Sequence, residues 1–165
     1  MKTHHCDWMT RRDLRRVLQI ESHCFPNPWD EPQFLFHLNR SEVRGIVARD
    51  AMDGRVIGFA IYSLATKSIT IQNLAVAPAR QGEGIGSSLV GCIASKLVDR
   101  RTTMIVDVCE LFSGANAFFR ACGMHPTSVI RRKYGNTLDA FRLSYDVDFS
   151  PLPLSNLCRQ GTSTP

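Results

Sequence analysis

The sequence predicts a mixed α/β sandwich. Two observations carry this prediction. Segments rich in the β-branched residues of strands alternate with segments of helical periodicity, and near the middle of the chain a strand runs through a glycine-rich turn into a helix. A length of 165 residues with 44% hydrophobic residues fits one domain with a substantial core.

The N-terminal region is predicted to hold two helices. Residues 10–24 carry apolar side chains at helical spacing, and Thr10 with Asp13 three residues later is a capping-box signal. A proline-rich elbow follows at residues 26–32. After it, we expect a short helix at about residues 33–38.

Three strands are predicted to come next. Residues 43–50 and 56–64 have strand composition, and Asp53-Gly54 between them is a hairpin signal. Residues 69–76 form a third apolar, β-branched run. An antiparallel pair of strands is therefore expected before the strand that leads into the glycine turn.

The glycine turn is the most informative segment for function. Pro78 ends the third strand, Gly82, Gly84 and Gly86 follow, and an amphipathic helix is predicted at about residues 86–100. Glycines at a helix start let backbone N–H groups approach a phosphate, and the helix N-terminus adds partial positive charge. The turn is therefore predicted to bind a pyrophosphate, with an ordinary tight turn as the alternative.

Two familiar nucleotide motifs fit this turn badly. A P-loop requires Lys followed by Ser or Thr after its last glycine, but Ser87-Ser88 follow Gly86. A dinucleotide fingerprint requires the spacing G-x-G-x-x-G, whereas the glycines here alternate with other residues. Both interpretations are rejected.

The remaining elements complete the sheet. Residues 103–109 are a predicted strand, residues 114–121 a helix with Gly123 as its C-cap, and residues 127–132 and 139–147 two further strands. Residues 1–149 are expected to form one domain without internal repeats. Residues 150–165 are rich in Ser, Thr and Pro, and we expect them to form a flexible tail.

Composition narrows the classes of protein. The basic residues that give a net charge of +5 lack interleaved aromatics, so we expect no direct nucleic-acid partner. No apolar run approaches the roughly 18 residues of a membrane span and no signal peptide is present, so a cytoplasmic protein without membrane association is expected.

Cysteine and histidine usage gives no sign of a metal site. The six cysteines are scattered without a C-x-x-C pair, so we expect reduced thiols, with Cys92, Cys109 and Cys122 as small core residues. His4-His5 has no second ligand cluster, and a solvated terminus is expected there.

Several motifs resemble one family. Gln81-x-x-Gly84-x-Gly86 after the strand Leu74-Ala75-Val76 resembles the acetyl-CoA-binding motif of the GNAT N-acetyltransferases. The elbow at residues 28–34, Val106-Asp107-Val108 and residues 130–134 are similar to elements of the ribosomal-protein-alanine N-acetyltransferases of RimI type. The resemblance implies the GNAT fold: a mixed, mostly antiparallel sheet flanked by helices, with splayed central parallel strands at the cofactor site.

The resemblance also implies site residues. Asp107 is expected to act as a general base through a water, or else to be a structural carboxylate. Tyr134 is expected to line the peptide slot or to replace a missing acid, or else to be an exposed loop tyrosine. Trp29 and Phe34 are expected to shape the opposite wall of the slot, or else to be core residues. The residues expected to bind acetyl-CoA as co-substrate are Leu74, Ala75, Val76, Gln81, Gly82, Glu83, Gly84, Ile85, Gly86, Ser87 and Ser88, with the backbone N–H of Val76 as oxyanion donor.

Three positions depart from the family pattern. Phe119 replaces the tyrosine that serves as general acid, Phe112 replaces an asparagine that supports the cofactor, and Asp107 is shorter than the usual glutamate. A phenyl ring cannot donate a proton. The sequence therefore leaves open whether turnover is slow or absent.

The resemblance implies an enzyme that transfers the acetyl group of acetyl-CoA to the N-terminal α-amine of a protein or peptide, with a ribosomal protein as one candidate. One alternative is a small-molecule amine as acceptor, held by the acidic residues Asp30, Glu31 and Glu42. The other is a non-catalytic acyl-CoA-binding module. The sequence leaves the oligomeric state open.

Overall fold

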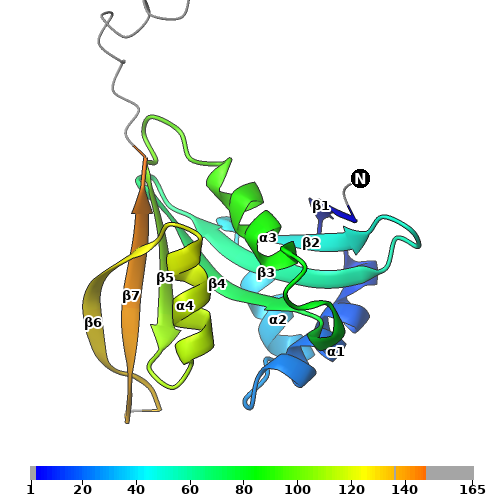
Figure 1. Ribbon diagram of the computed structural model, residues 1–165, viewed down its shortest axis with the longest axis horizontal. Coiled ribbons are helices and arrows are strands. Elements are labelled where there is room, and N and C mark those ends of the chain that lie inside the picture. The colour runs from blue at the N-terminus through cyan, green and yellow to red at the C-terminus, as the bar shows by residue number, and fades with distance from the viewer. Residues whose placement is uncertain (1–2, 136, 148–165) are drawn as a thin grey trace, which may run out of the picture.

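The computed structural model describes residues 3–135 and 137–147. These residues form one seven-stranded sheet with helices on both faces (Figure 1). The strands are β1 (His4–Trp8), β2 (Val43–Asp50), β3 (Val56–Leu64), β4 (Ser68–Val76), β5 (Thr103–Cys109), β6 (His125–Tyr134) and β7 (Leu138–Asp146). The helices are α1 (Leu14–Cys24), α2 (Glu31–Leu38), α3 (Ile85–Ala94) and α4 (Ser113–Ala121), with the 3-10 turns η1 (Arg11–Asp13) and η2 (Pro78–Arg80).

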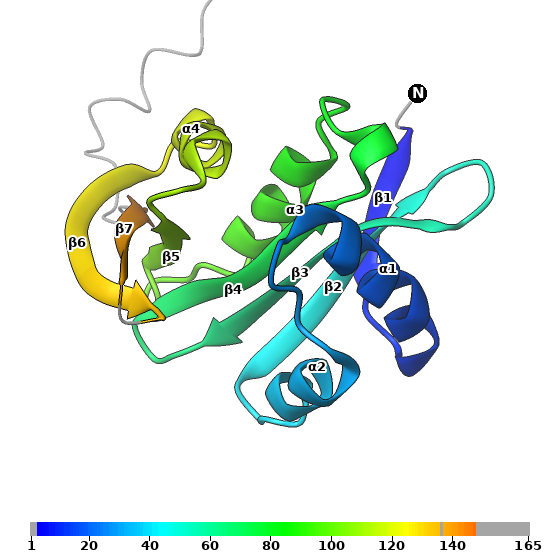
Figure 2. The same ribbon diagram turned by 90° about the horizontal axis from the view of Figure 1, so that it is seen from below.

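The sheet splays apart at its centre. The strand order is β1-β2-β3-β4-β5-β7-β6, and each neighbouring pair is antiparallel except β4 with β5. The parallel pairing stops at Ile71 and Val106, although β4 continues to Val76 and β5 to Cys109. Figure 2 shows the two strands diverging. The predicted mixed sheet with splayed central parallel strands is thereby confirmed.

Two apolar cores cover the two faces of the sheet. On one face, α1 and α2 pack on side chains that include the fully buried Phe34, Phe59 and Ile61. On the other, α3 and α4 enclose a cluster that includes Leu89 and Met104 (Figure 2). Because strand residues alternate between faces, a central strand must be apolar on both, and this explains the continuous apolar run of β3.

Local capping sets the starts of the first two helices. The predicted helix at residues 10–24 divides into η1 and α1, and Thr10 and Asp13 form the expected capping box. The second helix begins two residues earlier than predicted, since Asp30 caps α2 by accepting a hydrogen bond from the Gln33 backbone N–H at 2.9 Å.

The predicted end of the helix after the glycine turn was wrong. α3 ends at Ala94, six residues before the predicted end. The chain then tightens, as the Lys96 N–H donates to Ile93 and the Leu97 N–H to Ala94. Leu97 is thereby buried, and Arg101 Nε donates to the Ala65 carbonyl at 2.6 Å. Burial and this distant contact override the helical periodicity.

The N-terminal histidines do not form a solvated terminus. They belong to β1, which pairs antiparallel with β2 at the edge of the sheet. His4 and Cys6 are half-buried, whereas His5 and Asp7 are exposed, so alternate residues of β1 face opposite sides. Polar edge strands lack an alternating apolar signal, which is why the sequence did not predict this one.

The C-terminal half follows the prediction with small shifts. The strands predicted at residues 127–132 and 139–147 are the longer β6 and the nearly coincident β7. Gly123 comes one residue after the C-cap Cys122, at φ +86°, where a left-handed residue commonly ends a helix. Cys109 is buried, while Cys92 and Cys122 are half-buried free thiols. The predicted tail at residues 150–165 lies outside the described residues.

Candidate active site

The glycine turn forms an open cradle before α3. Gly82 and Gly84 adopt φ values of +82° and +78°, which favour glycine, and an added Cβ at either would meet no atom within 4 Å. Gly84 is the N-cap of α3, so the first N–H groups of the helix, next to this open space, have no acceptor within the helix. Free donors, open space and the positive end of a helix fit a pyrophosphate.

The charges beside the cradle are arranged around Arg80. Its Nε donates to both Glu83 carboxylate oxygens at 2.9 and 3.0 Å, and its Nη1 donates to Asp50 at 2.5 Å. The Arg80 hydrogen bonds hold the pKa of Glu83 and of Asp50 below their ordinary values. Two carboxylates therefore share one guanidinium next to a turn suited to an anion.

The end of β4 presents backbone groups to the gap between the splayed strands. The Ala77 N–H donates to Ile57 on β3 at 2.8 Å. Since backbone groups alternate in direction along a strand, the N–H of Val76 points away from β3, toward the gap. The Val76 carbonyl accepts from Gln81 Nε2 at 3.1 Å and from Cys24 Sγ at 3.3 Å. Gln81 thereby ties the turn to the strand end.

The other candidate cofactor residues differ in exposure. Ala75 and Ile85 are buried, which leaves their backbone groups as the available contacts. Leu74 is half-buried and packs toward α3. Ser87 is exposed at the start of α3, and Ser88 is half-buried beside it. The added Cβ of a residue at Gly86 would lie 3.0 Å from the Phe118 ring, so this glycine allows α4 to pack closely.

Asp107 lies on β5 beside the gap, and its carboxylate is held by two cations. The side chain is 6% exposed; Arg142 Nε donates to Oδ1 at 2.8 Å and Arg142 Nη2 to Oδ2 at 2.9 Å, while Lys133 Nζ also donates to Oδ2. Burial raises the pKa of this carboxyl, but the hydrogen bonds from Arg142 and Lys133 outweigh it and hold the pKa below its ordinary value. Asp107 is therefore ionised at neutral pH.

Tyr134 reaches the same strand end from β6. Its hydroxyl donates to the Asp107 backbone carbonyl at 3.1 Å. Burial, followed by the negative charge of Asp107, raises the pKa of this phenol. The hydroxyl therefore keeps its proton at neutral pH and is a potential proton donor.

The two phenylalanines that replace polar family residues have different environments. Phe119 on α4 is 6% exposed and packs in the core beneath α3 and α4. Phe112 is partly exposed at the N-cap of α4 and contacts Phe25 edge-on, with 6.5 Å between the ring centroids. Neither side chain offers a proton.

The two residues proposed to line the acceptor slot, Trp29 and Phe34, lie in and just after the elbow between α1 and α2 and differ in burial. Trp29 is half-buried and stacks on His37 with 4.3 Å between ring centroids. Phe34 is fully buried and packs edge-on against Phe59. Phe34 is thus a core residue, which was the alternative for it, and only Trp29 is left to line a slot.

Sequence reasoning missed Glu21, a buried carboxyl on α1. It is 1% exposed and accepts from the Trp29 backbone N–H at 2.9 Å and from Asn73 Nδ2 on β4 at 3.1 Å. Burial raises its pKa. The one sequence signal was its place beside Val17, Ile20 and Cys24 on the apolar helix face. Glu21 connects the elbow to β4.

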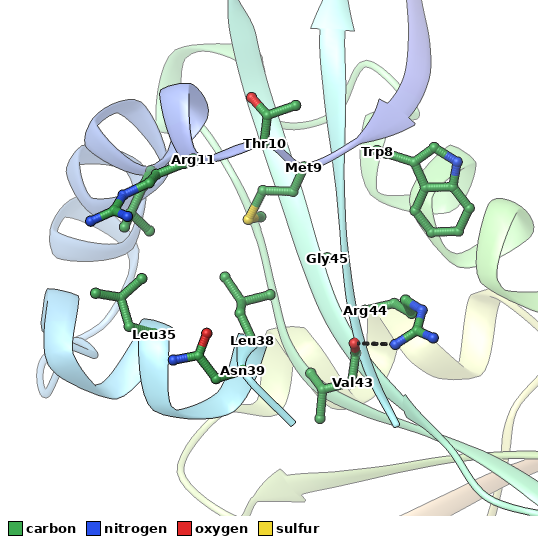
Figure 3. A pocket seen from close by; sticks show the side chains of 11 residues that line it. Trp8, Met9, Thr10, Arg11, Leu35, Leu38, Asn39, Val43, Arg44 and Gly45 are labelled. Atoms are coloured by element: carbon green, nitrogen blue, oxygen red, sulfur yellow. Dashed lines mark hydrogen bonds between the residues drawn. The ribbon is translucent and has the colours of Figure 1, made fainter. Parts of the chain in front are cut away.

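A separate hollow of about 430 Å³ lies between the start of α1, the end of α2 and β2. Figure 3 shows apolar side chains such as Met9, Leu35 and Leu38 around it, together with Arg11 and Arg44. No residue of the glycine turn or of the Asp107 strand end lines it. This hollow is therefore distinct from the candidate active site.

Other site classes find no support in the part of the chain that the structure describes. Residues 3–135 and 137–147 contain no group of three or more His, Cys, Asp or Glu side chains that could hold a metal ion. In the same residues, no helix is long and apolar enough to cross a membrane.

Comparison with known proteins agrees with this geometry. Residues 14–124 match the model of the acetyltransferase (GNAT) family. The chain is 28% identical over 144 residues to the [ribosomal protein bS18]-alanine N-acetyltransferase of Escherichia coli K12, covering 87% of this chain and 93% of the relative.

Two solved structures have the same fold. The crystal structure of the ribosomal-protein-S18-alanine N-acetyltransferase from Escherichia coli matches with a TM-score of 0.77 and 21% identity, over 90% of this chain and 96% of that one. Arabidopsis thaliana NAA60 in complex with acetyl-CoA matches with a TM-score of 0.75 and 15% identity, over 88% and 99%.

A splayed β4–β5 pair, a glycine cradle at a helix start and the family match together define the class: the chain belongs to the GNAT family of acetyltransferases. It is an N-acetyltransferase that uses acetyl-CoA as co-substrate.

Proposed function

We propose that the acceptor is the N-terminal α-amine of a protein or peptide, of the kind that ribosomal proteins present. The observation that carries this proposal is the charge around the acceptor side. Lys133 and Arg142 flank Asp107 at the end of β5. A cationic surround disfavours a polyamine, but it tolerates a single amine next to a peptide chain. Such acceptors occur in the cytoplasm, where we place the reaction.

The acidic residues that a small polycation would need are already engaged. Asp30 caps α2, and Glu42 is paired with Arg40 at 2.6 Å. Of the three, Glu31 alone neither caps a helix nor belongs to an ion pair of the described residues. The elbow is therefore poorly suited to hold several positive charges, and the activity of the curated relative on a protein N-terminus supports the peptide acceptor.

The proposed role of Asp107 is to orient the acceptor and to relay its proton through water. Its four lone-pair positions accept three hydrogen bonds, so one position on Oδ1 stays available for a water. A carboxylate with a lowered pKa is a weak base. An α-amine has a pKa of about 7.7 to 8.0, however, so a large share is unprotonated near pH 8 and a strong base is not required.

The remaining steps fall to the β4 end and to Tyr134. Acetyl-CoA supplies the acetyl thioester. The Val76 N–H points toward the gap, where it is suited to donate to the oxygen that becomes negative during amine attack. With phenylalanine at position 119, the protonated Tyr134 hydroxyl, which donates to the Asp107 carbonyl, is proposed as a slow substitute proton donor to the departing sulfur. A thiol with a pKa of about 8.5 can also leave as thiolate without help.

An acceptor panel tests the proposed function. Release of CoA should be measured with N-terminal peptides, diamines and aminoglycosides at equal concentration. We expect kcat/KM for the best peptide to exceed that of each polyamine at least tenfold. Faster reaction of a diamine or aminoglycoside would replace the peptide proposal with the small-molecule one. Binding of acetyl-CoA without turnover of any amine would favour a non-catalytic module.

A tyrosine at position 119 tests whether the absence of a general acid there limits the rate. Phe119→Tyr is expected to raise the single-turnover rate of peptide acetylation by about tenfold, a modest part of the effect of a general acid. Phe36→Tyr, at an exposed position of α2, is the control for adding a phenol and should leave the rate unchanged. A rate that is already high and does not change would mean that Tyr134 or water returns the proton.

Removing the carboxylate of Glu83 tests the charge balance of the cradle. Glu83→Gln leaves Arg80 paired with Asp50 alone, and we expect acetyl-CoA to bind about threefold to tenfold more tightly by calorimetry. Glu31→Gln on α2 changes the net charge equally on the opposite face and should leave affinity unchanged. Weaker binding by Glu83→Gln would instead mean that Glu83 holds Arg80 in place for the cofactor.

A further inference from the structure

The turn that we propose as the phosphate site has no free cation of its own. Residues 81–88 contain no lysine or arginine, and their one charged residue is the acidic Glu83. The neighbouring Arg80 is bound by two carboxylates. Acetyl-CoA carries a pyrophosphate and a further phosphate monoester, so a polyanion would enter a cradle with a surplus of negative side chains. A positive group is needed from elsewhere in the fold.

The edge strand β1 brings His4 to this place. His4 is paired with Asp50 across β1 and β2, and β1 runs beside α3 (Figure 1). The His4 Nε2 atom lies 2.8 Å from Ser88 Oγ in the first turn of α3, and Nδ1 lies 3.1 Å from Thr3 Oγ1. The Ser88 N–H closes that first turn by donating to the Gly84 carbonyl at 3.0 Å. The imidazole is thereby fixed at the helix start that forms the cradle.

We infer that His4 belongs to the cofactor site, where it holds the Ser88 hydroxyl and supplies a positive charge to a phosphate group of acetyl-CoA. The inference rests on the proposed cofactor site at the glycine turn. Imidazolium donates from both ring nitrogens, so one can hold Ser88 while the ring's charge attracts the anion. Histidine is the side chain that ordinarily gains and loses its charge between pH 5 and 8.

The charged groups around His4 fix the sign of the expected pH effect. Asp50 on β2 and Glu83 in the turn face this region, with Arg80 between them. The hydrogen bonds from Arg80 lower the pKa of both carboxyls and raise the pKa of Arg80. These three groups therefore keep their charge from pH 6 to 8. A change in affinity over that range therefore does not come from Asp50, Glu83 or Arg80.

The neighbouring residue provides a matched control. His5 is the next residue of β1, but it points to the opposite side of the sheet and is exposed. His4→Gln keeps a hydrogen-bonding group for Ser88 without a titrating charge. His5→Gln makes the same substitution at the adjacent histidine of β1, whose side chain does not face α3.

The experiment is calorimetric titration of each protein with acetyl-CoA, in the absence of any acceptor, at pH 6 and pH 8. The phosphate monoester of the ligand itself titrates near pH 6, so the decisive quantity is the affinity ratio between the two pH values in each variant relative to wild type. We expect His4→Gln to weaken binding by about threefold to tenfold at pH 6 and by less at pH 8. His5→Gln should behave as wild type at both.

A second ligand identifies the phosphate. If wild type and His4→Gln bind 3′-dephospho-CoA with equal affinity, the contact is with the 3′-phosphate. If His4→Gln still binds this ligand more weakly than wild type, the contact is with the pyrophosphate. Equal affinities and equal pH ratios for wild type and His4→Gln would overturn the inference while the cofactor site stands. Failure of wild type to bind acetyl-CoA at either pH would instead overturn the proposed site itself.

Discussion

Gly84→Val is expected to abolish acetyl-CoA binding while the domain stays folded. Gly84 adopts φ +78° at the N-cap of α3, where a β-branched residue costs about 1 to 2 kcal/mol and shifts the first helical N–H groups. Losing two charge-assisted hydrogen bonds of about 1.5 to 3 kcal/mol each lowers affinity by at least about a hundredfold. Titration calorimetry measures the affinity, and circular dichroism checks the fold.

The control for Gly84→Val is Gly54→Val in the hairpin between β2 and β3. Gly54 has φ +70°, and its added Cβ also meets no atom within 4 Å, so the backbone strain is matched away from the cradle. This variant should bind acetyl-CoA as wild type does. Unchanged affinity in a folded Gly84→Val protein would remove the glycine turn from the cofactor site.

Asp107→Asn is expected to lower turnover by about a hundredfold, the low end for loss of a general base, with acetyl-CoA affinity unchanged. The lowered pKa of Asp107 makes it a weak base, which sets this modest size. The variant also loses the acceptor for Arg142 and Lys133. We expect a stability loss of about 1 to 2 kcal/mol, below that of a fully buried pair because both cations are partly exposed.

The pH dependence of unfolding separates the two effects of Asp107. A carboxyl with a lowered folded-state pKa stabilises the protein above its unfolded-state pKa of about 3.8, and this contribution disappears as the pH falls through the lower folded-state value. Wild type should therefore lose stability more steeply on the acid side than Asp107→Asn, as measured by denaturant unfolding between pH 5 and pH 2.

Asp13→Asn is the matched control for Asp107→Asn. Asp13 in η1 is also a buried carboxylate that accepts from a basic side chain, Arg49 of β2, at 3.0 and 2.9 Å, and β3 separates β2 from the β4–β5 gap. It should lose stability and keep turnover. If Asp107→Asn likewise keeps wild-type turnover, Asp107 is a structural carboxylate and the attacking amine loses its proton directly to solvent.

The sequence by itself determined the local elements and the cofactor turn. The bounds predicted for β2, β3 and β5 match the structure, because β-branched runs and turn signals act over a few neighbouring residues. The sequence also predicted the Thr10 capping box, the glycine turn and the start of the helix that follows it. Each of these depends on backbone conformations that adjacent residues impose, so no distant partner is needed.

The tertiary structure decided which charges meet. Asp107 obtains its two cations from positions 26 and 35 residues further along the chain, Glu21 meets Asn73 at a separation of 52 residues, and His4 meets Ser88 at 84. Periodicity assigns a side chain to a face of a strand or helix but does not select its partner across the fold. Which partner it meets depends on the order of the strands in the sheet and on which strands pair at its edges. Backbone hydrogen bonds at a sheet edge can form with strands of almost any sequence, so the sequence does not specify that pairing. The charge interactions around Asp107 and around the glycine turn therefore depend on the assembled sheet and could not be predicted from the sequence.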